Sequence, residues 1–161
     1  MIEEFRDRKG KIVIKPEGKA VINRISAYGI AKQENKILFV RPTWKMEFDL
    51  PGGRVEVDEK IDEGLKRELL EETGFSIKIL NKTPIKTETA LFYADDLDIY
   101  FDSKMLFFLV EIVGEGNSQL INSNEIRAVS WLNLDTLETE PINKLHLSVI
   151  VEVKNSLQGL K

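Results

Sequence analysis

The chain of 161 residues is 42% apolar and 31% charged, a composition that supports one hydrophobic core and predicts a single domain over residues 1–161. Its formal net charge of -4 and its pI near 5.2 argue against binding to duplex nucleic acid or to an anionic membrane surface. The chain has no cysteine, signal-type segment or membrane-length apolar run, which excludes thiol chemistry and favours a cytoplasmic location.

Two runs of β-branched and aromatic residues come first, at 20–32 and 36–41, and the QENK sequence that joins them predicts a hairpin turn. The next segment, RPTWKMEFDLPGGR, contains two prolines and two adjacent glycines. This composition is typical of a loop that bends tightly or lets the backbone approach a ligand closely. Pro51, Gly52 and Gly53 therefore mark the boundary of the following element.

Residues 59–73 are strong helix formers without an internal proline, so we predict a helix of about four turns. Asp58 suits its N-cap, and Gly74 suits a left-handed C-terminal cap. Further strands are predicted at 75–80, 87–94, 104–114 and 127–134. Residues 142–157 carry an apolar stripe at helical spacing, which favours a helix, whereas their β-branched content favours a strand.

Three carboxylates lie close together on the first predicted helix. Glu68, Glu71 and Glu72 stand at i, i+3 and i+4 and therefore share one helix face. Their mutual repulsion is unfavourable unless a cation binds, and so is the position of Glu71 and Glu72 at the negative end of the helix dipole. Mg2+ prefers carboxylate oxygens and completes its coordination with water and substrate phosphate, so a magnesium site is predicted here. The alternative is a solvated acidic helix whose glutamates pair with Arg67.

The sequence from Gly53 onwards resembles the Nudix box, G-x5-E-x7-R-E-U-x-E-E-x-G-U, where U is aliphatic or aromatic. The likeness extends over about residues 20–135 through FDLPGG and EIRAVSWLNLDTL. The matching positions are Gly53, Glu59, Arg67, Glu68, Leu69, Glu71, Glu72, Gly74 and Phe75. This resemblance implies an α/β/α sandwich with a mixed β-sheet and Mg2+-dependent hydrolysis of a nucleoside diphosphate derivative, with Mn2+ as a substitute.

The resemblance also implies roles for individual residues. Glu68, Glu71 and Glu72 correspond to the carboxylates that bind metal and supply the general base, Glu68 and Glu72 foremost as ligands. Arg67 corresponds to an orienting residue, and Gly53 to the backbone that approaches metal or phosphate. Glu59 corresponds to a residue that supports this site. Glu125 corresponds to a further acid that acts as ligand or base, with a plain surface charge as the alternative.

Other candidates come from the residues themselves. Arg24, Arg41 and Arg54 flank the predicted site and could bind substrate phosphates, although solvated surface positions are the alternative for each. Four aromatic residues could stack on a nucleobase or could pack in the core or at its rim. They are Tyr28, Trp44, Phe48 and Tyr93. The one histidine, His146, is far from the box in sequence and is assigned no catalytic role.

Three functions remain open at this stage. The first is hydrolysis of a nucleotide substrate, which could be an oxidised nucleoside triphosphate, a nucleotide sugar or a dinucleoside polyphosphate. The second is a nucleotide-sensing module that binds without cleaving. The third, an isopentenyl-diphosphate-isomerase-like enzyme, usually needs a catalytic cysteine that this chain lacks. A homodimer is expected by analogy with the family.

Overall fold

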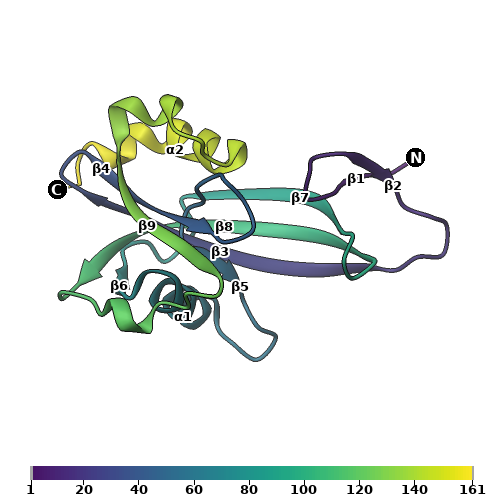
Figure 1. The fold of residues 1–161 in the computed structure, drawn as a ribbon, viewed down its shortest axis with the longest axis horizontal. Helices are drawn as coiled ribbons and strands as arrows, with labels where there is room; N and C mark the ends of the chain where they lie inside the picture. Colours follow the sequence, from purple (N-terminus) through teal and green to yellow (C-terminus); the bar gives the residue numbers. More distant parts are fainter. Residues whose placement is uncertain (1, 161) are drawn as a thin grey trace.

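The computed structural model describes residues 2–160, which form a long curled β-sheet with one helix on each face (Figure 1). Both helices cover the same half of the sheet, and the N-terminal strands lie at its opposite end. The strands are β1 Glu4–Arg6, β2 Ile12–Ile14, β3 Val21–Gln33, β4 Lys36–Pro42, β5 Gly52–Arg54, β6 Ser76–Ile79, β7 Lys86–Ala94, β8 Ile99–Val113 and β9 Ile126–Asn133. The α-helices are α1 Ile61–Thr73 and α2 Lys144–Leu157, and two short 3-10 helices cover Ser118–Leu120 and Leu134–Thr139.

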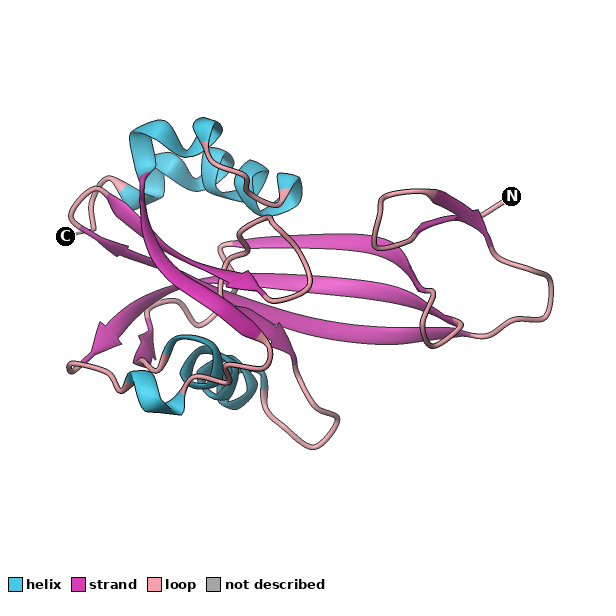
Figure 2. Ribbon diagram, in the orientation of Figure 1, coloured by secondary structure: helices cyan, strands magenta, loops and turns pink. Residues whose placement is uncertain are grey.

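The sheet is mixed, because its two longest strands run parallel at its centre. β3 and β8 pair in parallel from Val21 with Tyr100 to Ala31 with Val110. β1 also runs parallel to β7, whereas the other described pairings are antiparallel. The main path is β2-β1-β7-β8-β3-β4-β9, with β5 on β3 and β6 on β8. The predicted α/β/α sandwich with a mixed sheet is confirmed, as the separation of helices and strands in Figure 2 shows.

Side chains that alternate along β8 build two hydrophobic cores. Phe107 and Leu109 belong to the core beneath α2, whereas Leu106, Phe108 and Val110 belong to the core beneath α1. Because β8 is buried on both faces in this region, its sequence is continuously apolar rather than alternating. Burial of the two helices against opposite faces of one sheet therefore fixes the position of α1, which carries the glutamates.

Helix α1 begins later than the sequence predicts. The structure places its first residue at Ile61 and its N-cap at Lys60, so the predicted start at 59 with Asp58 as the cap is wrong. Glu59 stays outside the helix because its carboxylate binds Arg67 and the backbone N–H of Glu56. The predicted C-terminal end is confirmed: Gly74 has φ 74° and donates its N–H to the Leu70 carbonyl.

The remaining predictions are confirmed with shifted bounds or extended by new elements. The hairpin between β3 and β4 forms at the predicted turn, and α2 forms within 142–157 as a helix. The structure adds the β1–β2 hairpin, starts β8 at Ile99, and turns Gly52–Arg54 of the predicted loop into strand β5. Neither helix in residues 2–160 has the length and apolar character that a membrane crossing requires.

Candidate active site

A cavity of about 260 Å3 lies beside α1, between strand β3, the Gly52–Gly53 bend and the start of β9. Carboxylates and guanidinium groups both face it, which gives the cavity an acidic and a basic part. The lining residues are Arg24, Ser26, Tyr28, Pro42, Trp44, Asp49, Leu50, Gly52, Gly53, Arg54, Glu68, Glu72, Glu125 and Ile126. Of the predicted site residues, Gly53, Arg54, Glu68, Glu72 and Glu125 thus meet at one cavity.

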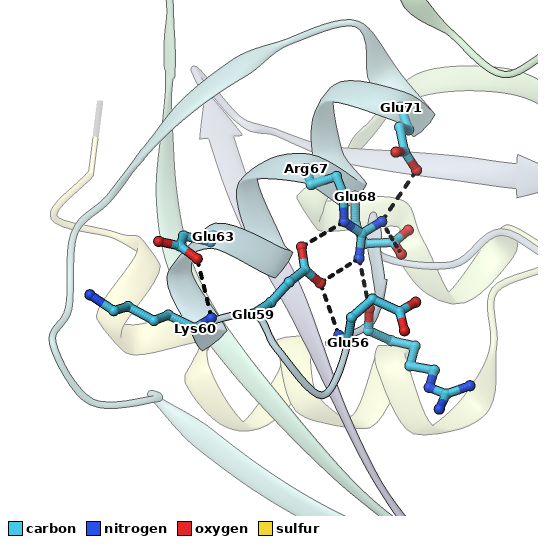
Figure 3. Close-up of polar contacts among 8 residues, drawn as sticks. Glu56, Glu59, Lys60, Glu63, Arg67, Glu68 and Glu71 are labelled. Carbon is cyan, nitrogen blue, oxygen red and sulfur yellow. Dashed lines mark hydrogen bonds and ion pairs between the residues drawn. The ribbon is translucent and has the colours of Figure 1, made fainter.

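Arg67 is the centre of the polar network on α1 (Figure 3). Its Nε donates to Glu59 Oε2 at 2.7 Å, and its Nη2 donates to Glu59 Oε1 at 2.8 Å. Its Nη1 donates to Glu68 Oε1 at 3.0 Å, and Nη2 also reaches the carbonyl oxygen of Arg54 at 3.0 Å. The hydrogen bonds from Arg67 lower the pKa of Glu59 to about 2. Arg67 therefore ties the box loop to the helix and orients Glu68.

Glu72 lies one turn further along α1 and faces the same cavity as Glu68. Its Oε1 accepts the backbone N–H of Gly52 at 2.9 Å, and no cationic side chain in residues 2–160 forms an ion pair with it. Burial raises the pKa of Glu72 well above its ordinary value, and burial also raises the pKa of Glu68. Burial thus disfavours the charged form of both carboxylates, and Glu68 alone of the two has a cationic partner, Arg67, to offset it.

Gly52 and Gly53, the first two residues of β5, are each required to be glycine for a different structural reason. Gly52 has φ 146°, and a Cβ there would lie 2.1 Å from the Ala27 carbonyl oxygen, so only glycine fits against β3. A Cβ at Gly53 would lie 2.8 Å from Glu68 Oε2. The absence of a side chain at Gly53 therefore lets the backbone of β5 come directly against the carboxylate of α1.

The compact cluster of three carboxylates expected from spacing is not formed within residues 2–160. No group of three or more Asp, Glu or His side chains in this part of the chain is close enough to hold a metal ion. Glu71 is absent from the cavity lining, and its side chain is 49% exposed. Successive residues of an α-helix point about 100° apart, so Glu71 leaves the face shared by Glu68 and Glu72, and its Oε2 lies 3.4 Å from Arg67 Nη1.

Two other residues that the sequence placed near the site, Arg41 and Tyr93, do not line the cavity. Arg41, predicted to bind substrate, is not among the residues that line the cavity, and its guanidinium carbon lies 5.6 Å from the ring centroid of the buried Phe48. Among the aromatic candidates, Tyr28 and Trp44 line the cavity, and Trp44 is 65% exposed. Tyr93 instead stacks on Tyr100 and donates its hydroxyl to Asp98.

Asp49 was missed by the sequence reasoning, which also did not foresee the structural role of His146 beside the site. His146 is remote from the box in sequence, yet its Nδ1 accepts the backbone N–H of Leu50 at 2.9 Å and its ring packs edge-on against Tyr28 at 4.7 Å. Burial lowers the pKa of His146 to about 4, which keeps the ring neutral and able to accept this bond. Asp49 lines the cavity and accepts hydrogen bonds from Lys45 and Asn143. No local pattern marks either residue.

Comparison with known proteins agrees with this fold. The structure of a NUDIX-family hydrolase from Clostridium perfringens superimposes with a TM-score of 0.66 at 17% identity, over 83% of this chain and 97% of that one. The fold is therefore that of NUDIX hydrolases. The family model of the NUDIX domain matches residues 23–152, and the chain belongs to this family.

Two curated relatives are also similar in sequence. An ADP-ribose pyrophosphatase from Methanocaldococcus jannaschii is 27% identical over 116 residues, which cover 70% of this chain and 63% of that protein. A MutT-like protein from Streptomyces ambofaciens is 26% identical over 115 residues, which cover 71% of this chain and 66% of that protein. The matched region thus spans slightly less than two thirds of either relative.

Proposed function

We propose that this protein hydrolyses the diphosphate linkage of a nucleoside diphosphate derivative with the help of a divalent cation, Mg2+ or Mn2+. The observation that supports it most is the pair of partly buried carboxylates, Glu68 and Glu72, that face one cavity together with the Gly53 backbone. An unneutralised carboxylate in such a place is costly, and a cation with oxygen ligands removes that cost.

The residues present fit a divalent cation. Glu72 has one neutral hydrogen-bond donor, Gly52, and its second oxygen can face a cation. Glu68 Oε1 is held by Arg67, which leaves Oε2 beside Gly53. A bound Mg2+ would neutralise charge on the diphosphate and lower the pKa of a water molecule. Glu68 and Glu72 would hold it, and the roles of Glu71 and Glu125 stay predictions because neither completes a preformed cluster.

The chain's own groups supply the rest of the proposed mechanism. Glu68 lines the cavity together with Glu72 and stays the predicted acceptor of the proton that the attacking water gives up. Arg67 keeps the Glu68 carboxylate in one orientation through its 3.0 Å hydrogen bond. The cavity opens beside Trp44, whose exposed ring offers a face on which a nucleobase can stack.

The proposal is tested by a substrate panel with product identification. ADP-ribose, the compound named for the Methanocaldococcus jannaschii relative, would be assayed beside UDP-glucose, diadenosine tetraphosphate and 8-oxo-dGTP, each with Mg2+ and with a chelator. Cation-dependent release of a nucleoside monophosphate is the expected result. Tight binding of a compound without turnover of any would contradict hydrolysis and favour the nucleotide-sensing alternative.

Further parts of the proposal concern the whole protein. Both hydrophobic cores pack on the same sheet, which supports a single domain over residues 1–161. A cytoplasmic location, a small-molecule nucleotide as the partner, and a homodimer also stay predictions. Size-exclusion chromatography with light scattering would test the dimer directly.

A further inference from the structure

Arg24 is a cationic side chain without an acidic partner, and it faces the cavity from β3. It forms no ion pair or hydrogen bond with any other residue in 2–160, and its Nε is buried with no acceptor. Arg67 and Arg8, by contrast, have acidic partners in Glu59 and Asp95, whereas Arg41 shares a buried Nε without an acceptor but does not line the cavity. A partly buried guanidinium without an anion is costly, so its position needs a reason.

The neighbours of Arg24 hold its side chain in place without neutralising it. Its guanidinium carbon lies 4.7 Å from the centroid of the Phe101 ring and 5.7 Å from that of Phe92. Loss of water around the group lowers the pKa of Arg24, and the nearby charge of Arg54 lowers it further. Aromatic faces attract a cation but accept no N–H in the manner of an oxygen, so the hydrogen-bonding capacity of Arg24 is left for a ligand.

The register of the sheet places Arg24 on the basic side of the cavity. Gly53, which lies against Glu68, pairs with Ala27 of β3, and Arg54 pairs with Ser26. Arg24 is three residues before Ala27, which corresponds to roughly 10 Å along an extended strand. The cavity therefore has the carboxylates of α1 on one side and Arg24 and Arg54 on the other. The long side chain of Arg24 can reach across part of the distance between the two sides.

We propose that Arg24 anchors the substrate by binding diphosphate oxygens on the side of the cavity that faces away from Glu68 and Glu72. This inference rests on the proposed function. An anionic diphosphate would supply the acceptors that Arg24 lacks in the protein, and the planar guanidinium suits two phosphate oxygens at once. Arg24 is thus a specificity residue for diphosphate compounds, distinct from the residues that hold a cation.

The test compares Arg24→Gln and Arg24→Lys with Lys104→Gln as the matched control. Lys104 lies on β8 beside Ser103, the parallel partner of Arg24, and is exposed, so its variant removes a charge from the same region of the sheet. The measurements are the KM and kcat for ADP-ribose and UDP-glucose with Mg2+, the calorimetric affinity for methylenediphosphonate, which is not hydrolysed, and the unfolding temperature of each variant.

Arg24→Gln is expected to raise KM, and to weaken methylenediphosphonate binding, by about 10- to 100-fold, with a smaller change in kcat. Arg24→Lys should lie between this variant and the wild type, and Lys104→Gln should match the wild type within about two-fold. A purely structural arginine would instead lower the unfolding temperature and leave affinity unchanged, and that result would overturn the inference. So would a wild-type protein that binds no methylenediphosphonate. If methylenediphosphonate binding depends on Arg24 but no substrate is turned over, the proposed hydrolysis is refuted, whereas the role of Arg24 in binding diphosphate is retained.

Discussion

Glu72 Oε1 accepts the backbone N–H of Gly52 at 2.9 Å, and this bond joins the last turn of α1 to the first residue of β5. The two residues are 20 positions apart in sequence. Since Gly52 supplies a neutral donor, the bond positions the carboxylate without cancelling its charge. The bend and the helix end are thereby held together around a group that still needs a cation.

Replacement of Glu72 by Gln should stabilise the metal-free protein at pH 7. The folded state raises the pKa of Glu72, so its ionised form is disfavoured there, whereas a glutamine is neutral and can still accept the Gly52 N–H. We expect urea unfolding in the presence of a chelator to show a gain of roughly 1 kcal/mol. A clear loss of stability in the variant would show that the carboxylate is already neutralised within the protein.

Arg67→Lys should weaken catalysis although it keeps the positive charge. Lysine cannot reproduce the two hydrogen bonds to Glu59 and the one to Glu68 at the same time, so the Glu68 carboxylate would lose its fixed orientation. Loss of such a supporting contact typically lowers activity by about 10- to 100-fold. Steady-state kcat/KM on the preferred panel substrate checks this, and a variant with wild-type kcat/KM would remove Arg67 from the orienting role.

Gly52→Ala should destabilise the fold much more than Gly18→Ala. Both glycines have positive φ, but a Cβ at Gly52 would meet the Ala27 carbonyl oxygen at 2.1 Å, whereas a Cβ at Gly18 would have no atom within 4 Å. The expected cost is about 1 kcal/mol at Gly18, from backbone strain alone, and more than about 3 kcal/mol at Gly52. Chemical denaturation measures both, and equal costs would contradict the tight contact between β5 and β3.

His146 should make the protein less stable as the pH falls from about 6.5 to about 4. Its pKa is about 4 in the folded state against 6.5 as the ordinary value, so the unfolded chain binds the proton first in this window. The difference corresponds to roughly 3 kcal/mol. The measurement is the pH dependence of the unfolding free energy relative to His146→Gln, a comparison in which the carboxylates common to both proteins cancel. Parallel curves for the two proteins would contradict a buried neutral histidine.

The sequence predicted the fold well where local patterns and packing agree. The runs of β-branched and aromatic residues, the QENK turn and Gly74 as a C-cap are local signals, and each was confirmed. The β1–β2 hairpin was missed because its strands have only three residues each, too few for a pattern to be read.

The candidate site was harder to predict because it depends on the orientation of side chains and on contacts between residues far apart in sequence. Spacing put Glu68, Glu71 and Glu72 near one another on α1, but it did not show that only Glu68 and Glu72 of the three line the cavity. Equally, 96 residues separate Leu50 from His146, so only the packing of α2 on the sheet brings them together. Such contacts depend on the tertiary structure and leave no trace in local sequence.

The central claim is that Glu68 and Glu72 hold a divalent cation on which diphosphate hydrolysis depends. The most direct test measures the hydrolysis rate of the preferred panel substrate against Mg2+ concentration for the wild type, Glu72→Gln and Glu63→Gln, the last being an exposed glutamate of the same helix. We expect saturable activation of the wild type and of Glu63→Gln, background rates with a chelator, and a loss of at least about 100-fold in Glu72→Gln. Turnover that survives chelation, or wild-type activity in Glu72→Gln, would contradict the claim.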